Sequence, residues 1–259
     1  GDEWLFIDPL REYVPGAPAR LAVVYREADV RPEAGGQCGL EHLRKAGRTF
    51  GLGPSGGKNH TTLRRLDIAT EGDGEYYQLY GVGGFDRIAA IINGVDGIYR
   101  GQINLFLRIT FQQLWTDPAT DPYTSTDSLT TLTQFKDWWN ANRANVNRDL
   151  AHLFSGKDLA SNIIGRAYLS VLCNDPTLSY GISQDIEPLF LRVELTAHEL
   201  GHNLSATHDD QSPVCAGVSC NGSGPIMCSI IQTNGSNTFS SCSKSQIDNH
   251  THNNGFCLN

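Results

Sequence analysis

Apolar residues near the start of the chain fall into two short runs, at residues 4–7 and 21–25. Prolines and a glycine separate these runs, which predicts a hairpin-like pair of strands. Residues 47–62 are rich in glycine, serine and other polar residues and show no periodicity, which is typical of a flexible linker. The pattern therefore divides the chain into a small N-terminal segment, residues 1–61, and a larger unit, residues 62–259.

The larger unit alternates between the hydrophobic periods of strands and helices. Strands are predicted at residues 63–70, 104–110 and 165–171, and helices at residues 88–99, 129–153 and 191–204. This alternation favours an α/β or α+β fold in which helices cover a sheet. From Ser205 onward the sequence is rich in cysteine and in loop-forming residues, and it shows little helix signal.

The third predicted helix contains the run VELTAHELGHNLSATHDD, which begins at Val193. His198 and His202 are four residues apart, so both imidazoles leave the same face of the helix and can reach one ion. Glu199 can hold a water molecule beside that ion, and His208 follows beyond the helix end, where a chain reversal would supply a third ligand. Three protein ligands leave the fourth position of zinc open, as hydrolysis requires, so the run predicts a zinc-dependent peptidase with Glu199 as general base.

Chance is a weak explanation for this spacing. From residue frequencies, His-Glu-x-x-His arises in such a chain with a probability of roughly one in a hundred, and His208 lowers it to roughly one in several thousand. The isolated histidines carry no such pattern, and we interpret His152, His250 and His252 as solvated surface residues.

Composition narrows the function classes. The chain has 259 residues, a formal net charge of -8, 39% hydrophobic residues and 19% charged residues, which fits a folded globular protein. The acidic balance argues against nucleic acid and anionic membranes as partners, since both attract basic surfaces. No stretch approaches the roughly 18 to 20 continuous apolar residues that a membrane span needs.

The seven cysteines are distributed unevenly, because five lie in the last quarter, Cys173 precedes them, and Cys38 stands alone near the start. Six cysteines could form three disulfides and leave Cys38 over, which indicates an oxidising compartment and a secreted or extracellular protein. The sequence does not fix the connectivity, and seven buried free thiols are the alternative.

The three histidines and the adjacent glutamate make the chain resemble the metzincin clan of metallopeptidases, and within it the adamalysin or reprolysin group. Asp209 after the third histidine, the sequence Ile226-Met227-Cys228 and the late cysteine cluster support the resemblance. It implies a mixed, mostly parallel twisted sheet with long helices, a zinc helix and a loop-rich, disulfide-bonded C-terminal subdomain. Met227 would lie beneath the zinc ligands as the methionine of the Met-turn, the alternative being an ordinary core methionine. Ser205 departs from the family, which has glycine at this turn.

The resemblance extends over most of residues 63–259 and implies further features. The strand at residues 165–171 would be the edge strand along which an extended protein or peptide substrate aligns. The family's disulfides would join Cys173 to Cys257, Cys215 to Cys242 and Cys220 to Cys228. A structural calcium would be held by Asp67, Asp149, Cys257 and Asn259, although Asn259 lies one residue closer to Cys257 than in the family's pattern.

The first 60 residues resemble the end of an adamalysin pro-region, with Cys38-Gly39-Leu40 in the place of that family's cysteine switch. A thiolate from outside the catalytic unit would fill the open position of zinc and displace the water. The resemblance therefore implies a latent enzyme, inhibited by its own pro-region and activated by cleavage between Arg44 and Thr61. An unpaired surface thiol is the alternative for Cys38.

These features predict an endopeptidase that hydrolyses peptide bonds in proteins with one catalytic zinc ion. Two other classes stay open at this stage. The chain could be a catalytically inactive, metzincin-like module that binds zinc, or a disulfide-stapled adhesion protein with an incidental zinc site. Retention of Glu199 argues against the inactive module, and one zinc ion per chain, lost together with activity on chelation, would exclude the adhesion protein.

Overall fold

The computed structural model describes residues 5–9, 14, 17–18, 21–26, 36–41, 62–222, 224–231 and 236–259. The proposed cleavage region between Arg44 and Thr61 lies outside these residues. The described strands are β1 (Leu5–Pro9), β2 (Ala22–Arg26), β3 (Gln37–Glu41), β4 (Arg64–Gly72), β5 (Leu105–Leu114), β6 (Leu150–Ser155), β7 (Ile163–Tyr168) and β8 (Tyr180–Gln184). The described α-helices are α1 (Gly74–Tyr80), α2 (Gly84–Ile103), α3 (Ser128–Asn142), α4 (Leu189–Asn203) and α5 (Ser241–Asn254).

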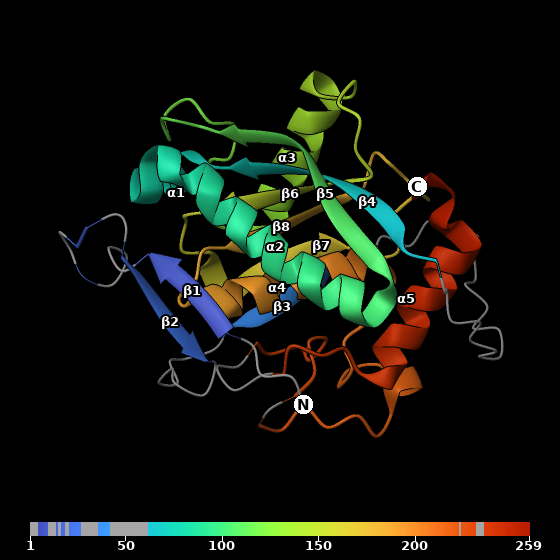
Figure 1. The fold of residues 1–259 in the computed structure, drawn as a ribbon. Coiled ribbons are helices and arrows are strands. Elements are labelled where there is room, and N and C mark those ends of the chain that lie inside the picture. The colour runs from blue at the N-terminus through green and yellow to red at the C-terminus, as the bar shows by residue number, and fades with distance from the viewer. Residues whose placement is uncertain are drawn as a thin grey trace.

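Six strands form one twisted sheet in the order β3-β7-β8-β6-β4-β5 (Figure 1). All neighbouring pairs run parallel except β7 and β8, which are antiparallel. The mixed, mostly parallel sheet implied by the family resemblance is therefore confirmed. β1 and β2 pair separately as the antiparallel hairpin that the apolar runs predict.

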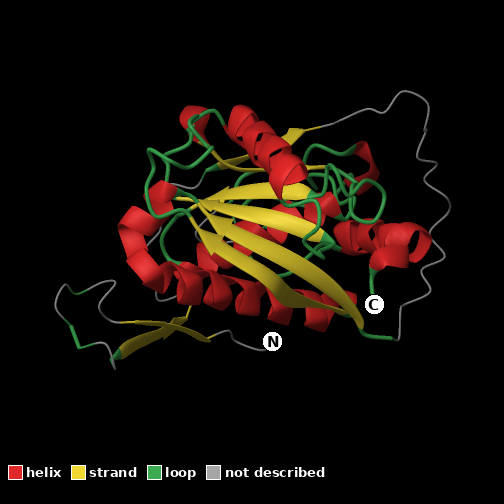
Figure 2. Ribbon diagram, turned by 90° about the horizontal axis from the view of Figure 1, so that it is seen from above, coloured by secondary structure: helices red, strands yellow, loops and turns green. Residues whose placement is uncertain are grey.

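Helices cover both faces of the sheet, and each face has its own hydrophobic core (Figure 2). On one face, α2 and α4 pack on the sheet through residues such as Ile91, Val95 and Leu195. On the other face, α3 packs through Phe135 and Trp139. Both helices of the first face alternate apolar and polar positions with a helical period, so burial of the apolar stripe stabilises them in this place.

Three sequence-based predictions are wrong. The helix predicted over residues 129–153 ends at Asn142, and Leu150 begins the buried strand β6. The C-terminal region contains a regular helix, α5, although it was expected to lack one. His152 and His250 are buried rather than solvated, with exposed fractions of 0% and 3%.

The three disulfides implied by the family resemblance are confirmed. Cys173 is bonded to Cys257, Cys215 to Cys242 and Cys220 to Cys228. Cys38 is the remaining cysteine, and its thiol is free and buried, so the surface-thiol alternative is wrong. Among the described residues, no helix is long and apolar enough to cross a membrane.

Candidate metal centre

Helix α4 carries the first two proposed ligands, and every one of its residues is buried. His198 and His202 project from one face, and the Nε2 atoms of their rings lie 2.9 Å apart. After α4 the chain reverses at Ser205, which has a φ angle of 79°. The reversal brings the Nε2 atom of His208 to 3.2 Å from that of His202. The predicted convergence of the three imidazoles is therefore present.

Each imidazole is oriented by an oxygen behind it. The Nδ1 atom of His198 lies 2.6 Å from the carbonyl of Ile226, and that of His202 lies 2.7 Å from the carbonyl of Ala206. His208 Nδ1 lies 2.9 Å from the side-chain oxygen of Gln211. Because a carbonyl oxygen only accepts hydrogen bonds, Nδ1 must carry the proton, and the Nε2 lone pairs face one another. Burial lowers the pKa of His198 to about 3, which keeps this ring neutral and able to bind a metal.

Cys38 completes the cluster from the N-terminal segment. Its Sγ atom lies 3.4 Å from Nε2 of His202. One ligand atom from each of Cys38, His198, His202 and His208 lies within 4.8 Å of the others, and all four residues are buried. Three imidazoles and one thiol are a donor set that tetrahedral zinc prefers, so the residues present fit this ion.

Backbone pairing on both sides holds Cys38 in place. Strand β3 runs parallel to β7, with Cys38 opposite Gly165. On the other side, the Cys38 amide donates to the carbonyl of Ser229 at 3.1 Å, and Ile231 donates to Gly36 at 3.0 Å. Burial raises the pKa of the Cys38 thiol well above its usual range, and the neighbouring Glu199 carboxylate raises it further. Backbone hydrogen bonds, and not a negative charge on the sulfur, therefore hold Cys38 beside the histidines.

Glu199 follows the first histidine and lies fully buried beside the cluster. Burial raises its pKa to about 8, while the Cys38 thiol and the Arg166 guanidinium lower it in part. A carboxyl with an elevated pKa can exchange a proton near neutral pH, which suits a general base. Its carboxylate lies against the backbone of β7, because a Cβ atom on Gly165 would fall 2.3 Å from its Oε1 atom.

Met227 lies directly behind α4, where its sulfur would be 2.6 Å from a Cβ atom on Gly201. The Met227 carbonyl accepts a hydrogen bond of 2.8 Å from the Asp209 amide, which follows the third histidine. Met227 is completely buried, as a floor beneath the ligands would be. Its role in the Met-turn stays a prediction that this position supports.

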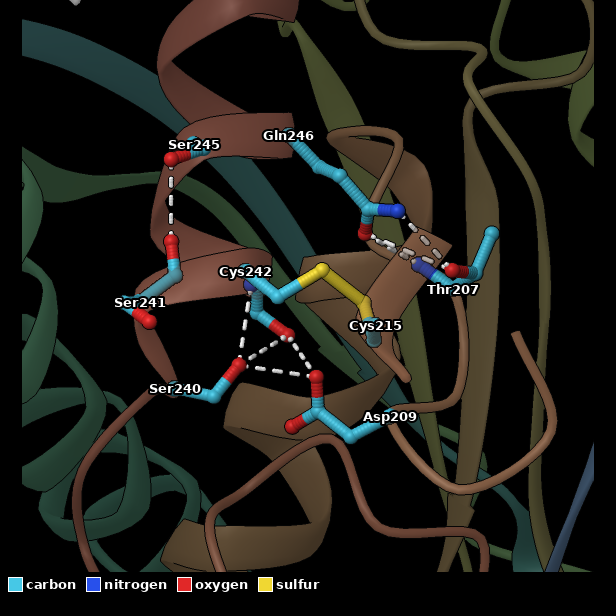
Figure 3. Close-up of a disulfide and its surroundings, with 9 residues drawn as sticks. Thr207, Asp209, Cys215, Ser240, Ser241, Cys242, Ser245 and Gln246 are labelled. Atoms are coloured by element: carbon cyan, nitrogen blue, oxygen red, sulfur yellow. Dashed lines mark hydrogen bonds between the residues drawn. A yellow bond between two sulfur atoms is a disulfide. The ribbon is translucent and has the colours of Figure 1, made fainter. Parts of the chain in front are cut away.

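Polar side chains at the start of α5 and within it hold the segment that carries His208, and no sequence motif pointed to them. Ser240 and Ser243 each donate a hydrogen bond of 2.8 Å to Oδ1 of Asp209. Gln246 accepts one of 2.9 Å from the backbone amide of Thr207. Figure 3 shows these contacts beside the disulfide between Cys215 and Cys242. No spacing in the sequence could reveal them, because α5 and the segment it contacts are joined by a long, irregular loop.

The proposed calcium ligands lie away from this cluster. The structure brings Asp67 and Asp149 together, since the Asp67 amide donates to the Asp149 carboxylate at 2.7 Å. Asn259 pairs with the backbone of Arg65 nearby. The Asp67 carboxylate, however, already pairs with Arg65 and with Arg108, the latter at 2.7 Å. Cys257 contributes its sulfur to a disulfide, and the calcium hypothesis stays a prediction.

A helix with two histidines four apart, a third histidine after a reversal and a buried glutamate define a zinc-dependent hydrolase. Comparison with known proteins agrees: the model of the reprolysin (M12B) family of zinc metalloproteases matches residues 82–259. The chain is 35% identical over 164 residues to snake venom metalloproteinase trimerelysin-2 of Protobothrops flavoviridis, covering 61% of this chain and 75% of that protein. The chain belongs to the reprolysin family, and it is a zinc metalloprotease.

A solved structure entitled "Structure of a chaperone-substrate complex" resembles the fold with a TM-score of 0.54. It is 15% identical in sequence, and the match covers 69% of this chain and 29% of that chain. At this identity the likeness shows the fold alone. The family assignment therefore depends on the reprolysin match and on the sequence similarity to trimerelysin-2.

Proposed function

We propose that this chain is a latent zinc endopeptidase in which residues 1–61 inhibit a catalytic unit formed by residues 62–259. One observation supports this proposal above all others. The Cys38 sulfur, contributed by the N-terminal segment, lies within 4.8 Å of the three histidine nitrogens, where water would otherwise complete the coordination of the ion. His198, His202 and His208 would hold the zinc, and Cys38 would occupy the remaining position.

Catalysis follows once Cys38 has left. Zinc, when bound, polarises the scissile carbonyl and makes water more acidic. Glu199 accepts the proton of the attacking water, and the same carboxyl then donates it to the amine that leaves. In the latent form Glu199 is fully buried, so solvent does not screen its carboxylate.

Proteins or peptides are the proposed substrates, aligned along β7. The N-terminal segment already demonstrates this type of pairing, since β3 adds to the outer side of β7 over five residues. An extended substrate needs the same backbone groups, so the segment would exclude substrate as well as fill the metal position. The three disulfides and the similarity to a venom protein support a secreted location.

The test compares the full chain with its Glu199→Gln and Cys38→Ala variants. Elemental analysis is expected to find one zinc ion per chain in all three proteins. With a quenched fluorescent peptide, Cys38→Ala is expected to turn over faster than the wild type without activating cleavage, but more slowly than after the linker is cut, because the segment still pairs with β7. The double variant with Glu199→Gln is expected to show no turnover. Full turnover in the double variant would exclude Glu199 as the base.

The same measurements separate the other classes. An inactive zinc-binding module would contain zinc but show no turnover in the Cys38→Ala variant or after the linker is cut. An adhesion protein with an incidental site would contain less than one zinc ion per chain. Equal basal turnover of the wild type and Cys38→Ala, together with higher turnover after cutting the linker, would contradict the proposed inhibitory role of Cys38.

A further inference from the structure

The turn that delivers His208 is built from a residue type that does not favour its backbone conformation. Ser205 has a φ angle of 79°, a region that glycine adopts freely and that L side chains rarely adopt. Ser170, which lies beside it, also has a positive φ angle, of 63°. Something other than backbone preference must therefore hold the chain in this conformation.

The Ser205 hydroxyl supplies that restraint through two contacts. Its oxygen lies 2.6 Å from the hydroxyl of Ser170 and 2.9 Å from Nδ1 of His250 on α5. The other nitrogen of His250 lies 2.9 Å from the carbonyl oxygen of Leu172. A carbonyl can only accept, so Nε2 of His250 carries a proton that it donates to Leu172.

The protonation of His250 fixes the direction of the bond to Ser205. Burial lowers the pKa of His250, so the ring is neutral and carries one proton. Because that proton is on Nε2, Nδ1 is an acceptor, and the single proton of the Ser205 hydroxyl is shared between this nitrogen and the Ser170 oxygen. A side chain without an acceptor at this point would leave the hydroxyl of Ser205 without this partner.

The neighbouring segment connects the same residues to the zinc helix. The amide of Ser170 donates to the carbonyl of His202 at 2.9 Å, and the amide of Leu172 donates to that of Asn203 at 3.0 Å. The disulfide between Cys173 and Cys257 ties this segment to the residues just after α5. His250 therefore joins the end of the zinc helix, the turn at Ser205 and the C-terminal helix.

We propose that His250 is a positioning residue for the third zinc ligand and acts through the hydroxyl of Ser205. The proposal rests on the proposed role of His208 as that ligand. Ser205 and His250 would then depend on each other. Ser205 adopts an unfavourable backbone conformation, and His250 restrains the Ser205 side chain by a hydrogen bond. Glycine at this position would need no such partner, because glycine has no Cβ atom to strain.

The experiment measures the rate at which the full chain loses zinc to an excess of a chromophoric chelator. Ser205→Ala keeps the strained backbone but loses the hydroxyl, and His250→Phe keeps the ring but loses the acceptor. Each is expected to release zinc about tenfold faster than the wild type, the size of effect typical of residues that orient metal ligands. His250→Phe in the Ser205→Gly background is expected to change the rate by less than about twofold.

Two further measurements distinguish positioning from ordinary packing. The cobalt-substituted Ser205→Ala and His250→Phe proteins are expected to show a shifted visible ligand-field spectrum, which a loss of stability alone would not produce. The conservative variant His250→Gln, which offers both a donor and an acceptor, is expected to release zinc nearly as slowly as the wild type. His252→Ala, an exposed histidine on the same helix, is the matched control and should release zinc at the wild-type rate.

Wild-type zinc release and cobalt spectra in both single variants would overturn the proposal, even if their melting temperatures fell. An equal effect of His250→Phe in the Ser205 and Ser205→Gly backgrounds would overturn it as well, because the two residues would then act independently. Failure of the underlying function looks different. In that case His208→Ala would bind and release zinc like the wild type.

Discussion

Gly165 determines how closely the proposed general base can approach β7. An added Cβ atom would lie 2.3 Å from Oε1 of Glu199 and 2.8 Å from a methyl group of Leu195. Both atoms are at the ends of side chains, so they would move while the backbone stays in place. In the Cys38→Ala background, Gly165→Ala is expected to lower kcat about a hundredfold, as small misplacements of reacting groups do.

Zinc content and thermal stability check the cause of that loss. Gly165→Ala should keep one zinc ion per chain, because the three histidines are not displaced. Gly101→Ala is the matched control, since an added Cβ there meets no atom within 4 Å. Unchanged kcat in Gly165→Ala would show that Glu199 tolerates displacement and that the close approach has no catalytic importance.

His152 makes the folded protein sensitive to acid. Burial lowers its pKa to about 3, whereas a histidine in an unfolded chain titrates near pH 6.5. Below pH 6.5 the unfolded state therefore binds more protons, and the free energy of unfolding decreases. This contribution is fully present above pH 6.5 and falls by about 1.4 kcal/mol per pH unit as the pH decreases toward 3.

Replacing His152 with asparagine removes this titration but keeps a polar group beside Ser183, whose hydroxyl lies 2.8 Å from Nε2 of the histidine. Between pH 7 and pH 5, His152→Asn is expected to lose about 2 kcal/mol less stability than the wild type in urea denaturation. The exposed His252 provides the control, and His252→Asn should match the wild type. Identical pH dependence of His152→Asn and the wild type would contradict the assignment.

At the scale of elements, α5 is held by its polar side chains more than by an apolar stripe. Ser240 caps its first turn by accepting a hydrogen bond of 3.0 Å from the Ser243 amide, and it also donates to Asp209. Ser240→Ala is expected to lower the free energy of unfolding by about 1 to 2 kcal/mol in denaturant titrations. Ser241→Ala, at an exposed position beside it, should change stability by less than about 0.5 kcal/mol.

This dependence on polar contacts explains which elements could be predicted from the sequence. Helix α2 and the zinc helix α4 were predicted because Ile88, Ile91 and Val95, or Leu195 and its neighbours, repeat with a helical period. Only four residues of α5 are buried, so its sequence carries almost no periodicity. The boundary between α3 and β6 was missed because apolar residues near Leu150 continue the helical spacing by coincidence.

The candidate site also combines residues that could be predicted from the sequence with one that could not. His198, Glu199, His202 and His208 could be found from sequence because α4 and the short turn after it fix their geometry locally. His250 could not be found, because its contact with Ser205 spans 45 residues. The serine in place of the family's glycine at position 205 was visible in the sequence. The contact of His250 with Ser205 became visible only in the folded structure.

At the scale of the whole molecule, the N-terminal segment completes the sheet of the catalytic unit. Strand β3 is the outermost strand beside β7, and α4, which carries His198 and His202, lies next to β3 and β7 (Figure 1). The hairpin of β1 and β2 adds a second contact, because the Phe6 ring packs at a tilt of 51° against Phe190 of α4, with ring centroids 5.6 Å apart. In the proposed latent form, inhibition would therefore depend on docking of the segment as well as on the sulfur of Cys38.

Gly39 tests the contribution of docking without changing the sulfur. A Cβ atom on Gly39 would lie 2.4 Å from the guanidinium of Arg166, which donates a hydrogen bond of 2.9 Å to Ser128. Overpacking at this contact costs about 1 kcal/mol, so Gly39→Ala is expected to raise basal peptide turnover about fivefold. Turnover after cleavage of the linker should not change, because Gly39 then no longer contacts the catalytic unit.

Arg166→Ala provides the decisive comparison, since it clears the space that the new methyl group would need. If the clash is the cause, Gly39→Ala should have no further effect on basal turnover in the Arg166→Ala background. Gln37→Ala, which removes an exposed side chain from the same strand, should leave latency unchanged. An equal rise in turnover for Gly39→Ala with and without Arg166 would mean that the strand itself, and not its contact with β7, responds to the substitution.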